Sequence, residues 1–503
     1  MNRIGIIEIG ANSVTLMLSE VDDDGYFRII DELNTSIRLY SDLIDGDELS
    51  SEKMNSALST LRSFKSMCEI TGVKRIIAVM SDSIRKVSNS SVLVDLIKNE
   101  LLIDIHPLKS DKEIYFSYLG VTNSLYIKNS LIIDIEGAST HLLWVKDDEI
   151  KEKATLPIGS LSLTNEFNLR DRIKVSDIDS CKEYIKELLE SSPWLKENKF
   201  DSVVGIGGTF QVISRMDRKR KRYPLDIAHN YVFSDIDVHE IYNILKVKDL
   251  KQRKAINGLP IDRADIIVGG AIIIDSVLKL TKTQRIVTSL NGVREGIMYD
   301  YLAKNYNYEK DILNYSILGI SKTLNINKTH AGNVYWLSKT LYEALLPLHR
   351  LTDETYSKIL KTASLLHDCG ISVNYYNHHK HSFYVILNSP INGLDHKELL
   401  MSAAVAASHR NNDYSLPLPP FTSIINKIDL TSIEYLGVIL KIAESLDRSL
   451  EGAVRNLEVV ITDDSVKLLL TSNLDLELEI RQASRAKRAF KEIFRKDLII
   501  EKV

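Results

Sequence analysis

Two short segments of this chain share one pattern, and this pattern constrains the fold more than any other feature. Residues 7–13 read Ile-Glu-Ile-Gly-Ala-Asn-Ser, and residues 133–139 read Ile-Asp-Ile-Glu-Gly-Ala-Ser, 126 positions later. Each predicts a strand, a tight turn and a returning strand. Such a turn offers backbone N–H groups to a phosphate and an acid to a metal ion. Two copies predict two related halves that close on one phosphate-bearing ligand, whereas either copy alone would also suit an ordinary hairpin.

Length, charge and cysteine usage bound the remaining possibilities. The 503 residues allow about three to four domains. The net charge of −4 excludes a polycation that binds nucleic acid along its length, so a polyanion site must be a local patch. The three cysteines lie far apart, which fits a reducing cytoplasm. Glu8 interrupts the first apolar run, and residues 266–274 fall short of the ~18 residues of a membrane span, so we expect a soluble, cytoplasmic protein.

Strand and helix signals alternate over the first 300 residues, which predicts an α/β architecture. Strands are expected at 4–9, 14–21, 27–31, 75–80, 131–135 and 202–205. Ser50 predicts the start of a helix with an apolar face from Met54 to Cys68, and a second helix is expected after Ser176.

The pattern changes after about residue 305. Residues 330–450 are mostly helical in pattern, and strand-like runs return at 457–461, 466–470 and 474–480, followed by a basic helix at 486–494. We therefore predict four domains, at 1–125, 126–305, 306–454 and 455–503.

Two further segments of the first 305 residues suit phosphate binding. Gly205-Ile-Gly207-Gly208-Thr209 follows a strand and opens a helix, where free N–H groups and the helix dipole favour an anion. Ser81-Asp-Ser-Ile-Arg85 also follows a strand, and Arg85 could bind a phosphate with two N–H groups, or form a surface salt bridge instead.

Histidines and basic residues form two other groups. Eight of the twelve histidines lie between 330 and 409, and His330, His367-Asp368 and Asp447 follow the ligand order of HD-type metal phosphohydrolases. His378, His379, His381 and His409 add further candidates, and the alternative is a scaffold of this type without metal. Six of the eight residues at 215–222 are basic, which suits either a solvated face or a patch that attracts a polyanion.

In this order the segments resemble the exopolyphosphatase / guanosine pentaphosphate phosphatase (Ppx/GppA) family. The likeness continues through residues 156–159, 223–226, 259–265 and 292–296 and the histidine-rich region, over essentially the whole chain. The resemblance implies two actin-like domains (ribonuclease H-like, of the sugar kinase/Hsp70 superfamily), an all-α HD-like domain and a small α+β C-terminal domain.

The resemblance also implies a chemistry, namely release of the terminal phosphate of polyphosphate, or of the 5′ phosphate of guanosine pentaphosphate, with Mg²⁺ or Mn²⁺. Glu113 falls on the family's general base, although the sequence alone would make it a solvated acid in a charged loop. Arg85 would clamp the terminal phosphate, and Glu8, Asp134 and His141 would hold the metal. The residues expected to bind the other phosphates are Gly10, Asn12, Ser13, Gly137, Ser139, Thr140, Gly207, Gly208 and Thr209.

The resemblance also implies a second divalent metal, and the basic run next to the phosphate-binding loops suggests a polyanion path. The expected ligands of the second metal are His330, His367, Asp368 and Asp447. The expected polyanion groove is formed by Arg218, Lys219, Arg220, Lys221 and Arg222. Family members of this length often form dimers, so a homodimer is the expected assembly.

The chain departs from the family pattern at the two hairpins themselves. The family has Asp-Ile-Gly-Ser-Asn-Ser at the first, where this chain has Glu8 and Ala11. It has Asp-Ile-Gly-Gly-Gly-Ser-Thr-Glu at the second, where this chain has Glu136, Ala138 and His141. Glu136 would repel phosphate unless a metal lies beside it, and His141 suits Mn²⁺ or Zn²⁺ better than Mg²⁺.

These departures leave three functions open. The first is an exopolyphosphatase-like hydrolase that uses Glu113. The second is a metal phosphohydrolase in the HD-like domain, with the hairpins as a nucleotide sensor. The third is a non-catalytic regulator that binds polyphosphate or guanosine tetra- or pentaphosphate. An actin-like ATPase or sugar kinase is a weaker alternative, because a histidine-rich helical domain is not expected there.

Overall fold

The computed structural model describes residues 2–42, 48–410 and 419–503. The chain divides into two compact units, Met1–Ile312 and Leu313–Val503. The four predicted domain limits stay a prediction, although each unit contains elements of the expected kind. None of the described helices is both long and apolar enough to cross a bilayer.

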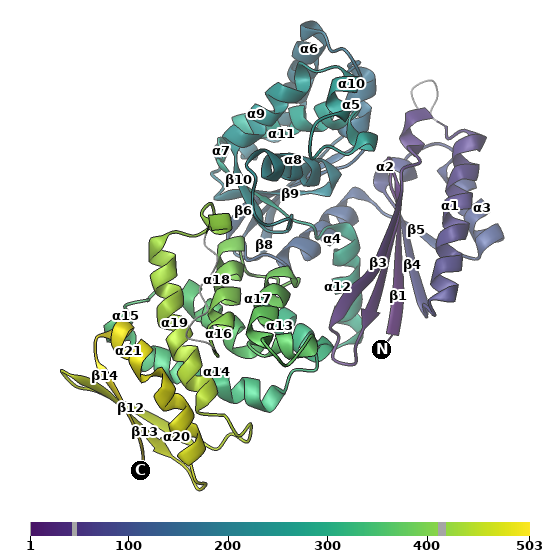
Figure 1. Ribbon diagram of the computed structural model, residues 1–503. Helices are drawn as coiled ribbons and strands as arrows, with labels where there is room; N and C mark the ends of the chain where they lie inside the picture. Colours follow the sequence, from purple (N-terminus) through teal and green to yellow (C-terminus); the bar gives the residue numbers. More distant parts are fainter. Residues whose placement is uncertain (1, 43–47, 411–418) are drawn as a thin grey trace. The chain divides into compact units, whose positions relative to one another are not determined.

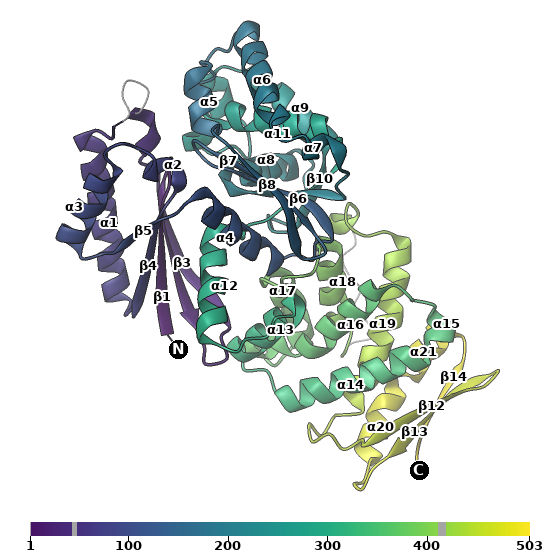
Figure 2. The ribbon, with the colours of Figure 1, turned by 180° about the vertical axis from the view of Figure 1, so that it is seen from behind.

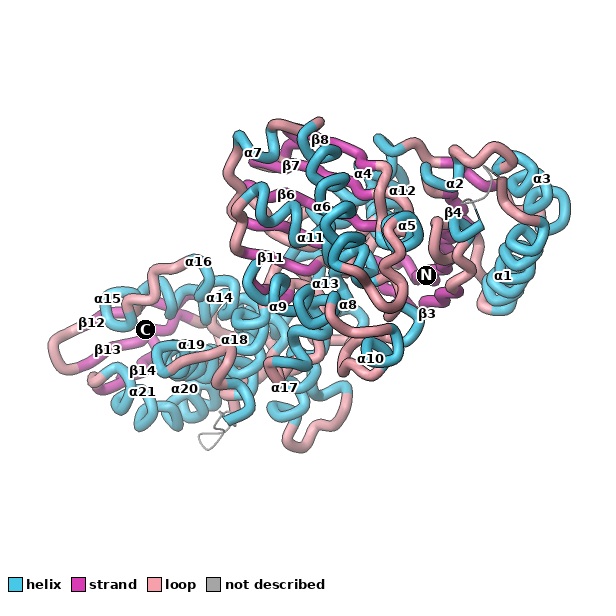
Figure 3. Tube along the Cα trace, turned by 90° about the horizontal axis from the view of Figure 1, so that it is seen from above, coloured by secondary structure: helices cyan, strands magenta, loops and turns pink. Residues whose placement is uncertain are grey.

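The first unit contains two sheets. The first sheet has the order β3-β2-β1-β4-β5, and the second has the order β10-β11-β9-β6-β7-β8. The strands of the first are β1 (Asn2–Ile9), β2 (Val14–Val21), β3 (Phe27–Thr35), β4 (Arg75–Met80) and β5 (Ile105–Pro107). The strands of the second are β6 (Asn129–Ile135), β7 (Thr140–Lys146), β8 (Glu149–Leu156), β9 (Ser202–Ile206), β10 (Tyr231–Ser234) and β11 (Arg285–Thr288). Figure 3 labels β8, β7, β6 and β11 of this sheet, and β9 lies between β6 and β11.

The two sheets repeat one topology. In the first, β1 pairs antiparallel with β2 and parallel with β4, while β3 and β5 lie outside them. In the second, β6 pairs antiparallel with β7 and parallel with β9, while β8 and β11 take the outer places and β10 adds one more strand. The duplication predicted from the two hairpins is therefore confirmed, and each hairpin lies at the centre of its own sheet.

Helices cover these sheets, as Figure 1 shows. The helices of the first half are α1 (Ser51–Ile70), α2 (Asp82–Arg85) and α3 (Ser90–Leu101). Those of the second half are α5 (Ser160–Glu166), α6 (Val175–Glu190), α7 (Trp194–Glu197), α8 (Gly207–Arg220), α9 (Asp235–Lys246), α10 (Leu250–Lys254) and α11 (Ile267–Thr281). The predicted start of α1 is confirmed, because the Ser50 side chain accepts a hydrogen bond from the Lys53 amide and the face from Met54 to Cys68 is buried.

Two helices, α4 (Ser110–Thr122) and α12 (Val293–Asn305), lie side by side between the two sheets (Figures 1 and 2). Their backbones approach closely, since a Cβ at Gly120 would lie 2.3 Å from the Gly292 carbonyl oxygen. Likewise, a Cβ at Gly296 would lie 1.9 Å from the Phe116 carbonyl oxygen. Both helices contact the central strands, since Arg294 of α12 pairs with Glu8 of β1 and Ser117 of α4 donates to Asp134 of β6.

The second unit is a helical bundle followed by a small sheet. Its helices are α13 (Ile312–Thr323), α14 (Lys328–Ala344), α15 (Leu346–His349), α16 (Glu354–Leu366), α17 (His378–Asn388), α18 (His396–Ala407) and α19 (Lys427–Ser445). The C-terminal part consists of β12 (Asn456–Ile461), β13 (Ser465–Thr471), α20 (Glu477–Ala483), α21 (Lys487–Phe494) and β14 (Asp497–Lys502). The helical pattern predicted for 330–450 is confirmed for residues 330–410 and 419–450, while 411–418 lie outside the described residues.

One predicted strand is wrong. Residues 474–480 alternate apolar and acidic side chains, but the segment enters α20 rather than the sheet. The alternation does not mark one buried face, because Leu474 and Leu478 are exposed while Leu476 and Glu479 are buried. The third strand of the sheet is β14, which pairs parallel with β13 and which the sequence analysis did not predict.

Candidate functional site

The two hairpin turns have the same backbone geometry. In the first, the Gly10 amide donates to the Ser13 carbonyl oxygen at 2.9 Å, and in the second the Glu136 amide donates to the Ser139 carbonyl oxygen at 3.0 Å. Glu136 therefore occupies the place that Gly10 has in the other half. A side chain at this turn position is the clearest local difference between the two copies.

The turns of the two halves meet. A Cβ at Gly137 would lie 3.0 Å from the Ala11 Cβ and 3.3 Å from the Asn12 amide nitrogen. The glycine loop joins them, because Gly207 has a φ of +84° and a Cβ there would lie 3.1 Å from Asp134 Oδ1. The structure thus brings together three of the segments that the sequence analysis assigned to phosphate binding.

Five side chains gather beside these turns, and we call them the acidic cluster: Glu8, Glu113, Asp134, Glu136 and His141. Glu113 lies in the first turn of α4 and is 1% exposed, so it is not the solvated acid that its local sequence suggests. One of its oxygens, Oε1, accepts a hydrogen bond from the Asp82 amide at 2.8 Å. The other, Oε2, lies 3.3 Å from His141 Nε2.

Glu113 Oε2 and His141 Nε2 are both buried without a hydrogen bond. The 3.3 Å between them is an ion-pair distance, but the angles do not form a hydrogen bond. Glu113, Glu136 and His141 each place one ligand atom within 4.8 Å of the others, which is a spacing that suits one metal ion. His141 Nδ1 is held by Thr155 Oγ1 at 3.1 Å. The orphaned atoms therefore fit a cation.

Burial raises the carboxyl pKa values in this cluster. The pKa of Glu136 lies well above its ordinary value because the group is buried and because Glu113, Asp134 and Glu8 are close. Burial also raises the pKa of Glu8, and Arg294 opposes this rise. Burial raises the pKa of Asp134 as well, and there His141 and Ser117 oppose the rise. Several acids share one buried region here, and a cation would relieve their repulsion.

Two of the predicted metal ligands, Glu8 and Asp134, already have protein partners. Glu8 Oε2 is paired with Arg294 Nη1 at 3.0 Å, and Arg294 is in the first turn of α12. Asp134 Oδ2 accepts a hydrogen bond from Ser117 Oγ at 2.9 Å. The atoms that gather at metal spacing belong to Glu113 and Glu136 together with the expected His141. Arg294 was not among the predicted site residues, although it lies in the segment 292–296 that is part of the family resemblance.

Arg85 is bound within its own half. Its guanidinium contacts Asp82 Oδ1 at 2.6 and 2.9 Å and the Leu108 carbonyl oxygen at 3.0 Å. Asp82 also donates its amide to Glu113, so Arg85 is connected to the acidic cluster through Asp82. Its role as a phosphate clamp stays a prediction.

The predicted phosphate-binding residues differ in whether their side chains already have hydrogen-bond partners. Asn12 is buried and its Oδ1 has no partner, and Ser139 Oγ donates to Glu136 Oε2 at 3.0 Å. Thr140 is bonded to the Ile158 carbonyl oxygen, and Thr209 packs against Gly270 of α11, so both contribute to the core. Gly10, Ser13, Gly137, Gly207 and Gly208 lie at the turns and the glycine loop described above.

Arg263 is a second residue that sequence reasoning missed. A Cβ at Gly208 would lie 2.7 Å from Arg263 Nη2, so the guanidinium lies against the glycine loop. Within the described ranges this guanidinium forms no hydrogen bond or ion pair. Burial lowers its pKa from the ordinary value, with Asp262 opposing. Arg263 lies in the segment 259–265, which is part of the family resemblance but was not among the predicted site residues.

Most charges of the basic run are paired with acids, and its role as a polyanion groove stays a prediction. Arg220 is paired with Asp217, Asp237 and Glu240, and Lys221 with Asp217 and Asp237. Lys219 lies 3.5 Å from Asp226, and Arg218 is buried over the ring of Tyr231. Because these charges are mostly neutralised by neighbouring acids, the structure reduces the polyanion attraction expected from the run.

The second unit contains another group of ligand atoms, which we call the histidine cluster: His330, His367, Asp368, His378 and His409. Two sets of three lie at metal spacing, His330–His367–Asp368 and Asp368–His378–His409, with Asp368 common to both. Asp447, a predicted ligand, instead accepts a hydrogen bond from His330 Nδ1 at 2.8 Å and another from the Gly452 amide. It supports a ligand rather than joining the sets.

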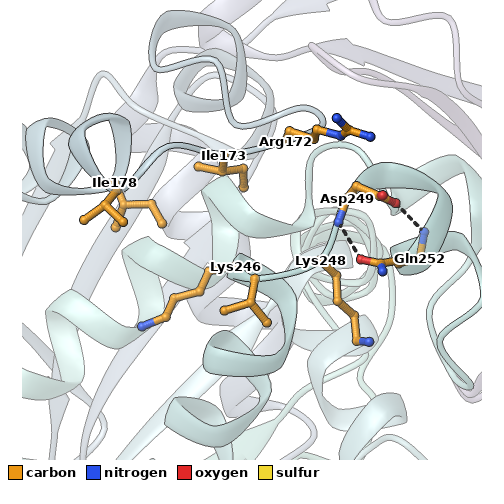
Figure 4. Close-up of a pocket in the computed structure, with 9 residues that line it drawn as sticks. Arg172, Ile173, Ile178, Lys246, Lys248, Asp249 and Gln252 are labelled. Carbon is orange, nitrogen blue, oxygen red and sulfur yellow. Dashed lines mark hydrogen bonds between the residues drawn. The ribbon is translucent and has the colours of Figure 1, made fainter.

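The cavity in Figure 4 has a volume of about 460 Å³ and lies among other residues of the first unit. Its lining includes the basic residues Arg172, Lys246 and Lys248, and Asp249 and Gln252 exchange two hydrogen bonds at its edge. None of the predicted site residues lines this cavity.

The Ppx/GppA phosphatase family matches residues 18–305, and domain III of the same phosphatases matches residues 312–487. The chain belongs to the Ppx/GppA phosphatase family. The predicted family, and the predicted enzyme class of phosphoanhydride hydrolase, are confirmed at this level. The domain III match also includes the helices of the second unit.

Several relatives of this Ppx/GppA protein are known. A guanosine-5′-triphosphate,3′-diphosphate pyrophosphatase of Pseudoalteromonas translucida is 23% identical over 82% of this chain and 81% of its own length. A bifunctional 3-dehydroquinate synthase/phosphatase of Fusobacterium nucleatum is 25% identical over 57% of this chain, and the match spans 44% of that protein.

Solved structures resemble about three fifths of the chain. An exopolyphosphatase from Cytophaga hutchinsonii is 27% identical with a TM-score of 0.56, covering 61% of this chain and 100% of its own. The Aquifex aeolicus Ppx/GppA protein is 23% identical with a TM-score of 0.52, covering 61% and 99%. These likenesses support the α/β fold of the first unit.

Proposed function

We propose that this Ppx/GppA protein releases a terminal phosphate from polyphosphate or from guanosine pentaphosphate at the acidic cluster, with Glu113 as the general base. The observation that carries the proposal is the position of Glu113. It is buried in the first turn of α4, with one oxygen fixed by the Asp82 amide and the other unpaired and facing His141. A carboxylate held in this way is oriented before any substrate binds.

Glu136 and His141 would hold a divalent cation beside Glu113 in this proposal, which leaves Glu113 Oε2 to act on water. A carboxylate and an imidazole suit Mn²⁺ and accept Mg²⁺. When bound, the cation supplies positive charge to the phosphoryl oxygens. The orphaned nitrogen of His141 and the raised pKa of Glu136 both support a cation between these side chains.

The turns would bind the phosphates of the substrate. Their backbone N–H groups and the buried Asn12 side chain lie beside the acidic cluster, and the helix α8 begins at Gly207. The unpaired guanidinium of Arg263 against Gly208 adds a cation with two N–H edges. This arrangement places anion-binding groups next to the carboxylate that would act on water.

Glu113 would take a proton from water as the water oxygen attacks the terminal phosphorus. The bond from that phosphorus to the bridging oxygen breaks, and the remaining polyphosphate or nucleotide leaves with the electron pair. The Asp82 amide holds Glu113 Oε1, so Oε2 is the oxygen that accepts the proton. The names of the relatives support these two substrate classes without deciding between them.

Phosphate release by the Glu113→Gln variant tests this proposal. Polyphosphate and guanosine pentaphosphate are each supplied with Mg²⁺, Mn²⁺ or Zn²⁺, and Glu152→Gln, an exposed position on β8, is the matched control. We expect Glu113→Gln to lose about 10²–10⁴-fold in rate and the control to lose none. A wild-type rate in Glu113→Gln would show that Glu113 is not the base.

A non-catalytic binder is the second candidate, and Glu136 favours it. This carboxylate occupies the turn position where the first hairpin has Gly10, so it stands close to where phosphate would approach. Tight binding of either substrate without phosphate release under any of the three metals would support the binder. Measurable release with any of them would exclude it.

A further inference from the structure

Each of the four histidine rings in the histidine cluster has a polar partner at Nδ1, the ring nitrogen that points away from the cluster. His367, His378 and His409 each place Nδ1 against a backbone carbonyl oxygen, at distances of 2.8, 2.9 and 2.6 Å. The acceptors are, in that order, the carbonyl oxygens of Ser364, Tyr375 and Ala406. His330 Nδ1 faces Asp447 Oδ2 at 2.8 Å. Every ring is therefore oriented with its Nε2 toward the others.

The acceptors decide which nitrogen carries the proton. A carbonyl oxygen accepts and never donates, so Nδ1 of His367, His378 and His409 is the protonated nitrogen. In a neutral imidazole the other nitrogen, Nε2, then presents a lone pair. The carboxylate of Asp447 favours the same tautomer for His330.

These lone pairs converge on Asp368. His378 Nε2 lies 2.9 Å from His409 Nε2 and 3.1 Å from Asp368 Oδ1. His330 Nε2 lies 3.2 Å from His367 Nε2, and both lie within 3.7 Å of Asp368 Oδ2. Several acceptors placed this close in a buried site repel one another unless a cation lies between them.

The spacing matches metal coordination. Two ligands about 2.1 Å from a tetrahedral metal are about 3.4 Å apart. The edges of the His330–His367–Asp368 set are 3.2, 3.6 and 3.7 Å. Those of the Asp368–His378–His409 set are 2.9, 3.1 and 3.6 Å. Each set uses a different oxygen of Asp368, which is the geometry of a carboxylate that bridges two metal ions.

We propose that the histidine cluster is a dinuclear transition-metal centre, bridged by Asp368, which binds a phosphate group on its open side. His330 and His367 hold one ion, and His378 and His409 hold the other. Imidazole-rich sets favour Mn, Fe, Co or Zn over Mg²⁺. The centre is independent of the acidic cluster and goes beyond the proposed function.

The open side of the centre is at Asp368. Its side chain is 22% exposed, whereas the four histidine side chains are 0–3% exposed. Arg410 directly follows His409, and Arg448 directly follows Asp447. Both guanidinium groups reach the hydroxyl of Tyr375, whose carbonyl oxygen anchors His378. Two arginines beside an open metal pair suit a phosphate oxyanion.

Metal analysis of the full-length chain loaded with Mn²⁺ tests the centre. All variants also carry His141→Ala, which weakens metal binding at the acidic cluster. The number of bound Mn²⁺ ions therefore reports mainly the histidine cluster. We expect two Mn²⁺ per chain, one after His367→Ala or His378→Ala, and none after Asp368→Asn. His381→Ala, in the same helix as His378 but outside both sets, is the control and should keep two.

Electron paramagnetic resonance gives a second reading that does not require every variant to fold. Two ions bridged by one carboxylate should show a spin-coupled Mn²⁺ spectrum, and inorganic phosphate should change it less in Arg410→Ala. An uncoupled spectrum, one ion per chain or an unchanged count in Asp368→Asn would overturn the dinuclear centre. A spectrum unaffected by phosphate would overturn the phosphate ligand.

Discussion

The acidic cluster and the histidine cluster both place buried ligand atoms at metal spacing, but they are built differently. The acidic cluster has two glutamates and one histidine at that spacing, and they come from α4, the second hairpin turn and β7. The histidine cluster has four histidines and one aspartate from one helical bundle. Its rings are anchored by three backbone carbonyls and a carboxylate, whereas His141 is anchored by one hydroxyl.

This difference teaches what each region is suited to do. Backbone carbonyls fix the histidine rings permanently, so the histidine cluster is organised before a metal arrives. In the acidic cluster, Glu113 Oε2 and His141 Nε2 are unpaired and three carboxyl pKa values are raised. Such a region changes its protonation and charge when metal and substrate bind, which suits catalysis better than tight storage of an ion.

Among the changes that compare the two clusters, the largest effect is expected from removing the single histidine of the acidic cluster. His141→Ala takes away the one imidazole ligand and should raise the Mn²⁺ concentration for half-maximal phosphate release by about 100-fold. A metal titration of the release rate measures this. His106→Ala, an exposed histidine on β5, is the control and should leave the titration unchanged. Equal titrations for the two variants would mean that His141 does not bind the metal.

Arg294→Met tests how the acidic cluster is held together. The variant leaves Glu8 largely buried without its ion pair, which should cost about 2 kcal/mol of folding free energy, since both side chains are about one-fifth exposed. Urea unfolding measures the loss, with the exposed Arg285→Met on β11 as control. Adding Glu8→Gln should restore part of the stability. If the double variant is no more stable than Arg294→Met, the ion pair is not the cause.

Asp447→Asn tests the anchoring of the histidine cluster. Asn removes the charge that favours the Nε2 lone pair of His330, so the affinity for one of two Mn²⁺ ions should fall about tenfold. Calorimetric titration with Mn²⁺ measures both affinities, and Asp463→Asn, in the exposed turn between β12 and β13, is the control. An unchanged affinity would show that the carboxylate does not support a ligand.

Much of the fold could be predicted from the sequence because its signals are local. The two hairpins, the Ser50 cap and the apolar strands all depend on neighbours within a few residues. The segment at 474–480 failed for the opposite reason, since its alternation is local but the burial of Leu476 and Glu479 is set by distant elements. β14 was missed because its pairing with β13 involves residues about 30 positions away.

The candidate sites were only partly predictable. His367, Asp368 and His330 could be named from their order, but the shared role of Asp368 needs the three-dimensional position of His378 and His409. Glu113 was named through the family, while its local sequence suggested a solvated acid. Arg294 and Arg263 gave no separate signal, because the partners that define them, Glu8 and Gly208, are far away in the sequence.

Asp82→Asn tests how much the Asp82 carboxylate stabilises the fold in acid. The same residue donates its backbone amide to Glu113. Burial alone raises the pKa of Asp82, but Lys86, Ser110 and Arg85 outweigh it and bring the pKa to about 2. The unfolded chain therefore binds more protons between pH 3.8 and about 2, so stability falls as the pH falls through this window. Asp82→Asn should lose about 1 kcal/mol of folding free energy at pH 7, and its stability should depend less on pH in the acid range. Unfolding at several pH values measures both, and the exposed Asp95→Asn should keep the wild-type pH dependence.

The smallest effect is expected from the basic run beside the glycine loop. Arg220 and Lys221 are already paired with acids, so Arg222, which is exposed, is the member left to act on a polyanion at a distance. Arg222→Ala should raise the KM for long polyphosphate by no more than about twofold, and less at high salt, because surface charges are screened. The exposed Lys199→Ala is the matched control. A tenfold rise in KM would show that the run guides the substrate despite its ion pairs, and would extend the phosphate-binding region beyond the turns and the acidic cluster.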